Sequence, residues 1–397
     1  MDMVFKEACR KGSLPEAAIQ SNPVLSGKCI ILCIAVKRSA MVRMKRNCIL
    51  QGLRVGAVIL AGKNTSVMTQ LRLWVLTKIM AASKSCALEV FMKKQIFRID
   101  SDGFNGAWYP ASVETSRGMI VMLGDSSEDH MAATGAKWLN QQGIHVMAMS
   151  ADKKDYGHHN YPLERFGRAI AFMKAHGCAK LGVTGASTTG MMALLAASYY
   201  PDLSLTIAIS PPDFVMEGFY RDGRDGAEER PGDNESSVSW QNKPLPYLPY
   251  AYRHPEYWKK IQEESKAGGD KVASRKMFDE SERRHPIQEE ERIRVENIHG
   301  KIIFIGAEDD VLWNTCKYIH RMEERLGSLP HDSTYESWLY EHGTHFVFPE
   351  SMLKMMLPVG SGLLVSIMFK AGKEHKKECR ETRMDIDRRM KKVLAEW

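Results

Sequence analysis

Short apolar runs alternate with amphipathic segments along the chain from residue 92 onward. The run GMIVMLG at 118–124 is apolar and partly β-branched, which predicts a buried strand, and IHVMAMSA at 144–151 predicts another. Between them, the apolar residues recur at helical spacing and the pattern ends at Gly143, which favours a helix closed by that glycine. A strand, a helix and a second strand in this order predict a right-handed crossover between parallel strands.

The same alternation continues through most of the chain. A helical pattern covers 162–177, with Pro162 at its start and Gly177 at its end. The further predicted elements are a strand over 180–185, a helix over about 188–200, a strand over 203–210, a strand over 301–310, a helix over 314–327 and a strand around 333–343. The pattern therefore predicts an α/β protein with a mainly parallel sheet and helices on both faces.

Residues 211–300 interrupt this alternation with a segment rich in charge, proline and aromatic side chains. The segment lies between two predicted core strands, and a long insertion in that place favours a cap that covers a site. Its aromatic residues could line an acyl pocket. The alternatives are an insertion without function, and aromatic side chains that only pack the cap onto the body.

The two ends of the chain differ from the middle. Residues 1–91 show no sustained strand or helix period, so Met92 is the true initiator or the upstream segment is a small extra domain. The intact mass of the protein from its native source distinguishes the two. The main domain is expected to cover 92–372. Residues 373–397 are expected to form an amphipathic helix docked on it, because apolar residues recur there at helical spacing.

The net charge of +7 comes from the N-terminal segment. The first 91 residues carry 14 Lys and Arg against 4 Asp and Glu, and the remaining residues carry 41 against 44. The main domain is therefore not basic, and no nucleic-acid partner is expected. The longest apolar runs, such as CIILCIAV from Cys29, are much shorter than the roughly 20 residues of a membrane span. Cysteines without metal-ligand spacing favour reduced thiols and a cytoplasmic location.

Ser187 stands where a predicted strand meets a predicted helix. The sequence GASTTG at 185–190 satisfies the first half of the nucleophile-elbow pattern GxSxG and misses the final glycine by one position. An elbow serine sits in a strained turn, and glycines on either side avoid clashes between the strand and the helix. Thr189 holds the second glycine position here, and Gly190 is expected to relieve the crowding. The alternative interpretation is a serine that only caps the helix.

A nucleophilic serine needs a base to accept its proton and an acid to orient that base, in the chain order Ser, Asp or Glu, His on a sheet of this type. The acid is expected just past the strand that follows the insertion, where Asp309 and Asp310 stand. One of the two is expected to form the turn. The base is expected in the loop after the last strand, which contains His342 and His345. The agreement of these placements favours a catalytic triad.

These stretches resemble the C-terminal α/β-hydrolase domain of acyl-CoA thioester hydrolases and bile acid-CoA:amino acid N-acyltransferases. The resemblance covers about 117–358, and the matching segments are YPLERFGRAIAFMK, GASTTGMMALLAASYYPDLSLTIAISPPDFVMEGF, IIFIGAEDDVLW and HGTHFVFPE. It implies the α/β-hydrolase fold with a cap insertion. It also implies that Ser187 is the nucleophile, that Asp310 is the acid with Asp309 as the alternative, and that His345 is the base.

The resemblance further implies an oxyanion hole. Its donors would be the backbone N–H of Thr188 and one N–H from the loop after an early strand, at Asp125 or Ser126. No metal and no other cofactor is implied.

Two features depart from the family. Thr188 and Thr189 replace its usual residues after the nucleophile, and residues 1–91 do not resemble the β-sandwich that precedes this domain in the animal enzymes.

The resulting prediction is a serine hydrolase that forms an acyl-enzyme with a small-molecule ester or thioester, with acyl-CoA thioesters as the leading substrate class. A carboxylesterase or a peptidase of the same fold would use the same residues. A catalytically inactive binding protein that kept the fold is the alternative of a different class.

Overall fold

The structure is a computed structural model that describes residues 94–123, 126–150, 159–220, 230–357 and 361–397. The predicted N-terminal segment at 1–91 lies outside the described residues, and so does Asp125.

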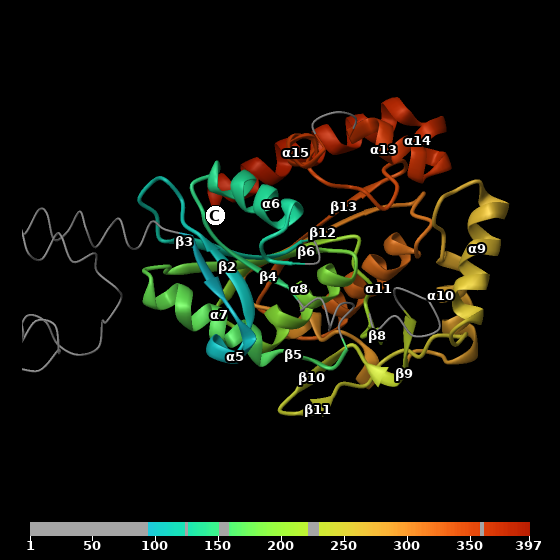
Figure 1. Cartoon of the computed structure of the whole chain (residues 1–397), viewed down its shortest axis with the longest axis horizontal. Coiled ribbons are helices and arrows are strands. Elements are labelled where there is room, and N and C mark those ends of the chain that lie inside the picture. Colours follow the sequence, from blue (N-terminus) through green and yellow to red (C-terminus); the bar gives the residue numbers. More distant parts are fainter. Residues whose placement is uncertain (1–93, 124–125, 151–158, 221–229, 358–360) are drawn as a thin grey trace, which may run out of the picture. The chain divides into compact units, whose positions relative to one another are not determined.

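Within the described residues, one eight-stranded sheet forms the centre of the molecule, with the strand order β1-β2-β4-β3-β6-β7-β12-β13 (Figure 1). β2 runs antiparallel to both of its neighbours, and the strands from β4 to β13 are parallel. This is the sheet of the α/β-hydrolase fold, so the predicted fold class is confirmed. The strands are β1 (Gln95–Phe97), β2 (Asn105–Tyr109), β3 (Arg117–Met122), β4 (His145–Ser150), β6 (Lys180–Ala186), β7 (Leu203–Ile209), β12 (Lys301–Ala307) and β13 (Thr334–Tyr340).

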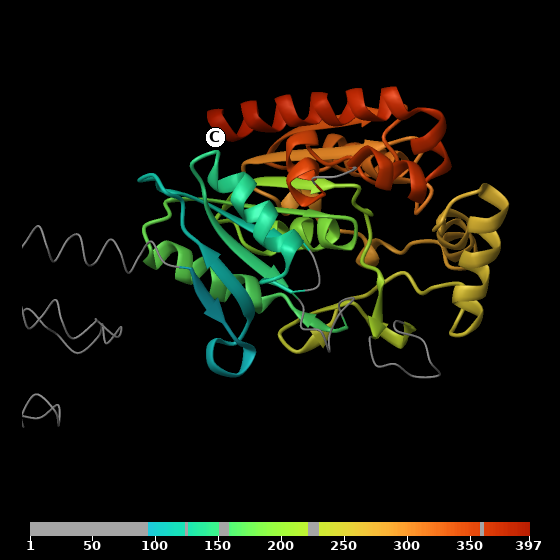
Figure 2. The same cartoon turned by 45° about the horizontal axis from the view of Figure 1, so that its top comes forward.

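Helices cover both faces of this sheet (Figure 2). Successive residues of β3 point to opposite faces: Met119 and Val121 pack with one set of helices, and Ile120 and Met122 with the other. Burial on both faces explains why the strands are continuous apolar runs. The first set is α6 (His130–Asn140), α12 (Glu350–Met356) and α15 (Lys376–Glu396), and the second is α7 (Glu164–Ala175), α8 (Thr188–Tyr199) and α11 (Thr315–Ser328).

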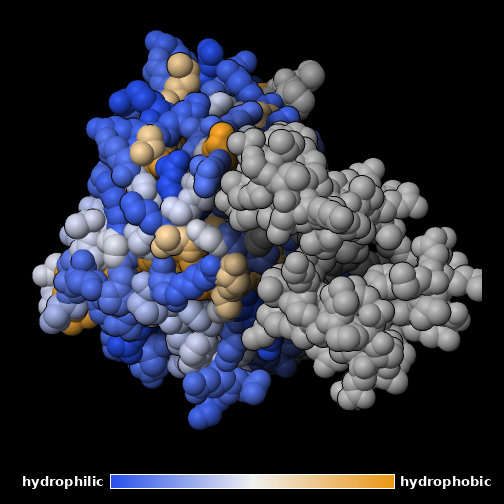
Figure 3. All heavy atoms as spheres, turned by 90° about the vertical axis from the view of Figure 1, so that its left-hand side faces the viewer, coloured by the Kyte–Doolittle hydropathy of each residue, from blue (hydrophilic) through white to orange (hydrophobic). Residues whose placement is uncertain are grey.

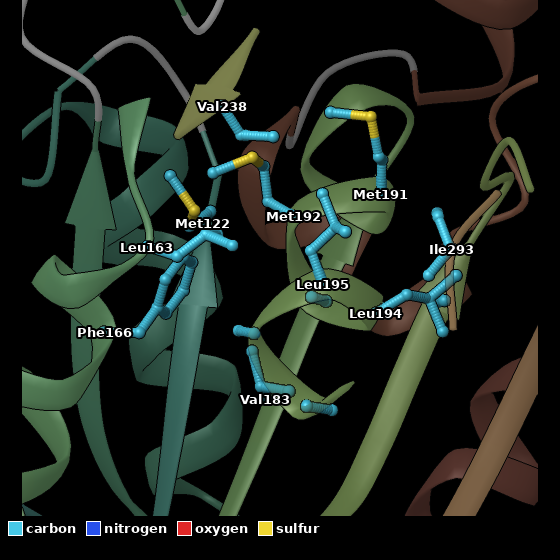
Figure 4. Packing of buried hydrophobic residues seen from close by; sticks show 14 of the residues in the cluster. Met122, Leu163, Phe166, Val183, Met191, Met192, Leu194, Leu195, Val238 and Ile293 are labelled. Carbon is cyan, nitrogen blue, oxygen red and sulfur yellow. The ribbon is translucent and has the colours of Figure 1, made fainter. Parts of the chain in front are cut away.

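Helix α8 is apolar on every side, as a helix must be when it is enclosed by other elements. Met191 and Met192 lie in its first half, and Met192 points toward Met122 of β3 and Val238 of the insertion (Figure 4). Eight of its residues, from Gly190 to Ala197, are buried. This packing fixes the start of α8, and therefore the residue just before it, relative to the sheet.

The insertion between β7 and β12 folds onto the α8 and α11 side of the sheet. Phe214 and Phe278 belong to the same apolar cluster as these helices. Tyr250 contacts Tyr257, with ring centroids 5.3 Å apart, and both contact Phe219. These aromatic side chains thus pack within the insertion. Its elements are β8 (Glu217–Tyr220), β9 (Arg230–Ser236), β10 (Val238–Trp240), β11 (Lys243–Pro244), α9 (Glu256–Gly268), α10 (Arg275–Arg284) and two 3-10 helices, Glu289–Glu291 and Val295–Asn297.

The structure differs from the sequence prediction at the start of α7. The helix begins at Glu164, whereas the sequence pattern placed Pro162 at its start. Tyr161–Pro162 forms the short strand β5, which pairs in parallel with Val238 and Ser239 of the insertion. A partner strand from far along the chain therefore overrides the local preference of proline for a helix start.

The C-terminal residues form the short helices α13 (Ser361–Met368) and α14 (Lys370–Glu374), followed by α15. α15 buries Cys379, Ile386, Met390 and Val393. A short helix α5 (Ile99–Asp102) joins β1 to β2. The face of the described part shown in Figure 3 is mainly hydrophilic, with scattered apolar residues. Among the described helices, none has the length and hydropathy needed to cross a membrane.

Candidate functional site

Ser187 occupies a strained turn between β6 and α8. Its backbone has φ 61° and ψ −131°, and its N–H donates to the Ile209 carbonyl at 2.8 Å. A residue other than glycine held in such a conformation costs about 1–3 kcal/mol, which the surrounding structure must supply. The Ser187 side chain makes no cap hydrogen bond to α8, and the residue is partly exposed. The geometry therefore fits a nucleophile elbow and not a helix cap.

The two glycines near Ser187 allow the turn to be tight. A Cβ atom on Gly185 would lie 2.0 Å from the Thr189 carbonyl oxygen, and one on Gly190 would lie 2.9 Å from the Ile209 carbonyl oxygen. Gly185 thus gives room to the first turn of α8, and Gly190 lets the helix approach β7. Gly185 and Gly190 provide the space that the Thr189 side chain was expected to take up. The missing glycine of the pattern therefore does not prevent the turn.

Asp310 and His345 form a buried pair. His345 Nδ1 lies 2.7 Å from Asp310 Oδ2, and the two side chains are 6% and 0% exposed. The carboxylate also accepts hydrogen bonds from the Thr315 hydroxyl at 2.5 Å and from the Leu312 N–H at 2.9 Å. These donors replace the water that the carboxylate loses on burial.

The second ring nitrogen of His345, Nε2, makes no hydrogen bond to a described residue. A carboxylate only accepts hydrogen bonds, so Nδ1 donates to Asp310, and in the neutral ring Nε2 then carries the lone pair. Nε2 is buried, and it has no hydrogen-bond partner among the described residues. The arrangement presents an oriented base whose free lone pair can accept a proton.

The contacts of β7 connect this histidine to the elbow. Ile209 accepts the hydrogen bond from the Ser187 N–H, and the next residue, Ser210, donates from its hydroxyl to the His345 carbonyl at 3.3 Å. The Trp313 indole donates to the Ser210 carbonyl at 3.2 Å and packs edge-on against the His345 ring, with centroids 4.9 Å apart. The elbow, Ser210 and the His345 loop therefore adjoin at the carboxyl ends of the parallel strands.

Asp309 makes different contacts from Asp310. Its Oδ1 accepts hydrogen bonds from the N–H groups of Gly343 at 3.0 Å and Thr344 at 2.7 Å. Thr344 has a φ of 59°, so this carboxylate stabilises a turn with an unfavourable backbone conformation. Asp309 therefore holds the loop that carries His345, whereas Asp310 holds the imidazole itself.

His342, the other histidine of the loop, is oriented differently. Its Nδ1 lies 3.4 Å from Asp309 Oδ2, and its ring stacks on His375 with centroids 3.7 Å apart. The Thr382 hydroxyl of α15 donates to the His342 carbonyl at 2.5 Å. These contacts attach the loop to the C-terminal helices and do not join His342 to Asp310.

Of the N–H groups predicted to form the oxyanion hole, the two that are described differ in whether they already donate a hydrogen bond. The Thr188 N–H lies in the first turn of α8 and donates to no other described residue. The Ser126 N–H donates to the Asp129 carboxylate at 3.0 Å, so it is already used in this structure. Asp125 lies outside the described residues. The free Thr188 N–H at a helix N-terminus is suited to hold a developing negative charge.

The described cysteines are poorly suited to act as nucleophiles. Burial raises the pKa of Cys178 and Cys379 to about 11. Burial, together with the nearby carboxylates of Glu308 and Asp310, also raises the pKa of Cys316. Thiols with raised pKa values stay protonated near neutral pH and react poorly. In the part of the chain that is described, no cluster of His, Cys, Asp or Glu side chains could hold a metal ion.

One feature of the site was not predicted from the sequence: the insertion is bound to the loop that carries Asp310. The N–H groups of Ser274 and Arg275 both donate to the Val311 carbonyl at 3.0 Å, and the Ser274 hydroxyl donates to the Leu312 carbonyl at 2.7 Å. The Arg275 guanidinium donates from one nitrogen to the carbonyls of Glu308 at 3.0 Å and Asp310 at 3.1 Å. No motif marks these residues, because their acceptors are backbone carbonyls.

Replacing Arg275 by alanine is expected to lower kcat/KM about tenfold. The loss of its two hydrogen bonds, at about 0.5–1.5 kcal/mol each, loosens the Asp310 loop. Arg275→Lys is expected to give a kcat/KM between those of wild type and Arg275→Ala, since an ammonium group keeps the charge but not the planar geometry in which one guanidinium nitrogen donates to both carbonyls. Steady-state ester hydrolysis measures the effect, with Lys276→Ala as the control for an exposed neighbouring cation. Equal kcat/KM in wild type and Arg275→Ala would contradict this role.

Comparison with known proteins identifies the central part of the chain. Residues 161–355 match the family model described as BAAT / Acyl-CoA thioester hydrolase C terminal, and this range includes Ser187, Asp310 and His345. No curated protein sequence matches the chain.

Several solved structures are similar to this one at low sequence identity. Est1E from Butyrivibrio proteoclasticus is 13% identical, with a TM-score of 0.35 over 72% of this chain and 98% of that one. The Pyrococcus furiosus esterase Pf2001 is 13% identical, with a TM-score of 0.40 over 63% of this chain and 83% of that one. The Pyrococcus horikoshii acylaminoacyl peptidase is 11% identical, with a TM-score of 0.36 over 64% of this chain and 38% of that one.

The family match and the strand order lead to the same identification. The match covers β6, β7, β12 and β13, which are parallel neighbours in the central sheet. Residues 161–355 form a domain of the BAAT/acyl-CoA thioester hydrolase C-terminal family, and the protein is an α/β hydrolase.

Proposed function

We propose that the protein is a serine hydrolase that cleaves small-molecule acyl thioesters or esters, with acyl-CoA thioesters as its substrate class, through a triad of Ser187, His345 and Asp310. The observation that carries the proposal is the buried Asp310–His345 hydrogen bond, which leaves the imidazole Nε2 without a partner among the described residues, in a loop joined through Ser210 to the strand end that holds the strained Ser187 elbow. The family match supports the acyl-CoA class. No metal or other cofactor takes part in this scheme.

In the first half-reaction, His345 Nε2 accepts the hydroxyl proton of Ser187 while Ser187 Oγ attacks the acyl carbonyl carbon. Asp310 stabilises the imidazolium that forms. The imidazolium then donates its proton to the departing thiolate or alkoxide as the bond between carbonyl carbon and leaving group breaks. The products of this step are a free thiol or alcohol and an acyl ester on Ser187.

The oxyanion of each tetrahedral intermediate is held by backbone amides. Thr188 supplies one N–H, and the loop after β3 supplies the other, at Asp125 or Ser126. Asp125 is the better candidate, because the Ser126 N–H already donates to Asp129. In the second half-reaction, His345 takes a proton from water, the hydroxide oxygen attacks the acyl carbon, and Ser187 leaves with the proton returned from His345. An amine in place of water would give an amide.

The proposal includes a cytoplasmic location and no nucleic-acid partner. Its support is that Cys178, Cys316 and Cys379 are buried, unpaired thiols, which a reducing compartment maintains.

The test is labelling with a fluorophosphonate probe, which reacts with activated serine hydroxyls. Wild type is expected to be labelled on the peptide that contains Ser187, and Ser187→Ala is expected to lose this labelling, because the proposed activated hydroxyl has been removed. Ser198→Ala is the matched control, since Ser198 lies at the far end of α8, where its hydroxyl donates to the Leu195 carbonyl. That variant is expected to label as wild type does.

The substrate class is then assigned by measuring kcat/KM for three compounds that carry the same acyl group: a CoA thioester, a p-nitrophenyl ester and a peptide anilide. A higher kcat/KM for the thioester supports the proposal. Preference for the ester or the anilide would make the protein a carboxylesterase or a peptidase of this fold. Correctly folded wild type without labelling would favour a catalytically inactive binding protein.

A further inference from the structure

The Thr189 hydroxyl makes contacts that the nucleophile-elbow pattern does not require. Thr189 Oγ1 accepts a hydrogen bond from the Ala186 N–H at 2.9 Å. Its single proton lies within reach of two carbonyl oxygens, Ala186 at 2.8 Å and Met122 at 2.9 Å. One hydroxyl therefore links the end of β6, the start of α8 and the end of β3.

This link stands where the backbone pairing of β3 and β6 ends. The last residues paired between the two strands are Met122 and Gly185. Beyond them the strands separate, because β6 turns into the elbow. The Thr189 hydroxyl lies between the Ala186 N–H and the Met122 carbonyl, so it continues the connection between the strands past their last pair.

Both ends of this connection lead directly to the oxyanion hole. On the β6 side, Ala186 precedes Ser187, and Thr188 follows with its free N–H. On the β3 side, Met122 precedes the loop that holds Asp125 and Ser126. The position of the Thr188 N–H relative to the end of β3 therefore depends on how firmly β3 is held to β6 at this point.

We propose that Thr189 is a positioning residue of the oxyanion hole: its hydroxyl holds the turn that carries Ser187 and the Thr188 N–H against the end of β3 at Met122. The inference rests on the function proposed above. Because Gly185 and Gly190 already provide the close approach that the elbow needs, position 189 can carry a side chain, and this chain uses it for a hydrogen-bonded link.

Three substitutions of Thr189 distinguish the effect of its hydroxyl from the effect of the rest of its side chain. Thr189→Val keeps the volume and removes the hydroxyl, which leaves the Ala186 N–H and the Met122 carbonyl without this partner. Thr189→Ser keeps the hydroxyl and removes the methyl group. Thr189→Gly restores the glycine of the GxSxG pattern without the link. Thr206→Val is the matched control, since Thr206 is fully buried on β7 and its hydroxyl has no partner among the described residues.

The readout is hydrolysis of p-nitrophenyl butyrate by the full-length chain, with kcat and KM determined separately. Thr189→Val and Thr189→Gly are expected to lower kcat about 10- to 100-fold and to change KM less than about twofold. A displaced donor costs less than the 100- to 1,000-fold seen when a donor is removed. Thr189→Ser is expected to recover at least half of the wild-type kcat. The pH profile of kcat is expected to keep its shape, because the His345–Asp310 contact is untouched.

A second measurement isolates the oxyanion. An alkyl trifluoromethyl ketone adds to the serine and places a negative oxygen in the hole, so its inhibition constant is expected to rise in Thr189→Val by the same factor as kcat falls. Circular dichroism and thermal unfolding establish that each variant is folded. Thr189→Gly replaces Thr189→Val in the comparison if the valine variant does not fold.

Three results would overturn the inference alone. The first is a folded Thr189→Val or Thr189→Gly with kcat within twofold of an active wild type, and the second is a Thr189→Ser variant as slow as Thr189→Val. A loss of the same size in Thr206→Val would also overturn it, since the effect would then follow from any buried threonine. A wild type that neither hydrolyses the ester nor reacts with fluorophosphonate would overturn the proposed function and this inference together.

Discussion

His345→Ala is expected to lower kcat about a millionfold, which is the scale of loss for removal of the base in serine hydrolases with this arrangement. The physical reason is that Nε2 of this ring, which has no partner among the described residues, is the proposed base nitrogen. Without it, the Ser187 hydroxyl keeps its proton at neutral pH and the leaving group departs without a proton donor. The measurement is kcat in a stopped assay with long incubation.

The double variant Ser187→Ala/His345→Ala tests whether the two residues act as a unit. It is expected to be no slower than either single variant, because each alone already removes the proton transfer. His342→Ala is the control within the same loop, and a loss below about tenfold is expected since its ring pairs only loosely with Asp309. A His342→Ala variant that is as inactive as His345→Ala would show that the loop as a whole, not one imidazole, is required.

The parts of the fold that the sequence predicted correctly have strong local signals. β3 and β12 are apolar over consecutive residues because helices cover both faces of the sheet, and that burial is visible as an uninterrupted run. β1 and β2 lack this signal: β1 has only three residues and lies at the edge of the sheet, and β2 is the next strand. β5 was missed for a different reason, because its partner Val238–Ser239 lies in the insertion.

The candidate site divides in a similar way. Ser187 has a local signal, the glycine-flanked join of strand and helix, and the structure gives it the expected backbone strain. Asp309 and Asp310 could not be separated from sequence spacing, since neighbouring residues at a strand end differ only in the direction of their side chains. Thr189 was interpreted from the sequence as a source of crowding. Its partner Met122 is distant along the chain, so the hydrogen bond that explains it could not be predicted.

Asp310→Asn is expected to lower kcat about ten-thousandfold while the protein stays folded. An asparagine oxygen in the place of Oδ1 can still accept from the Leu312 N–H, and the amide group in the place of Oδ2 can donate to the Thr315 hydroxyl oxygen, so the loop keeps both contacts. Its amide group, however, can donate to His345 Nδ1, which places the imidazole proton on Nε2 and removes the lone pair that Ser187 needs. The negative charge that stabilises the imidazolium is lost as well. Steady-state kinetics on a p-nitrophenyl ester, with thermal unfolding as the folding check, measures the change.

Asp309→Asn is the matched control, because it makes the same chemical change at the adjacent residue. Its carbonyl can still accept from the N–H groups of Gly343 and Thr344, so the His345 loop keeps its turn, and a loss of less than about tenfold in kcat is expected. The ratio between the two variants therefore separates orientation of the imidazole from support of the loop. If Asp309→Asn were the slower enzyme, Asp309 would be the acid, and the Asp310–His345 hydrogen bond would serve only to hold the two loops together.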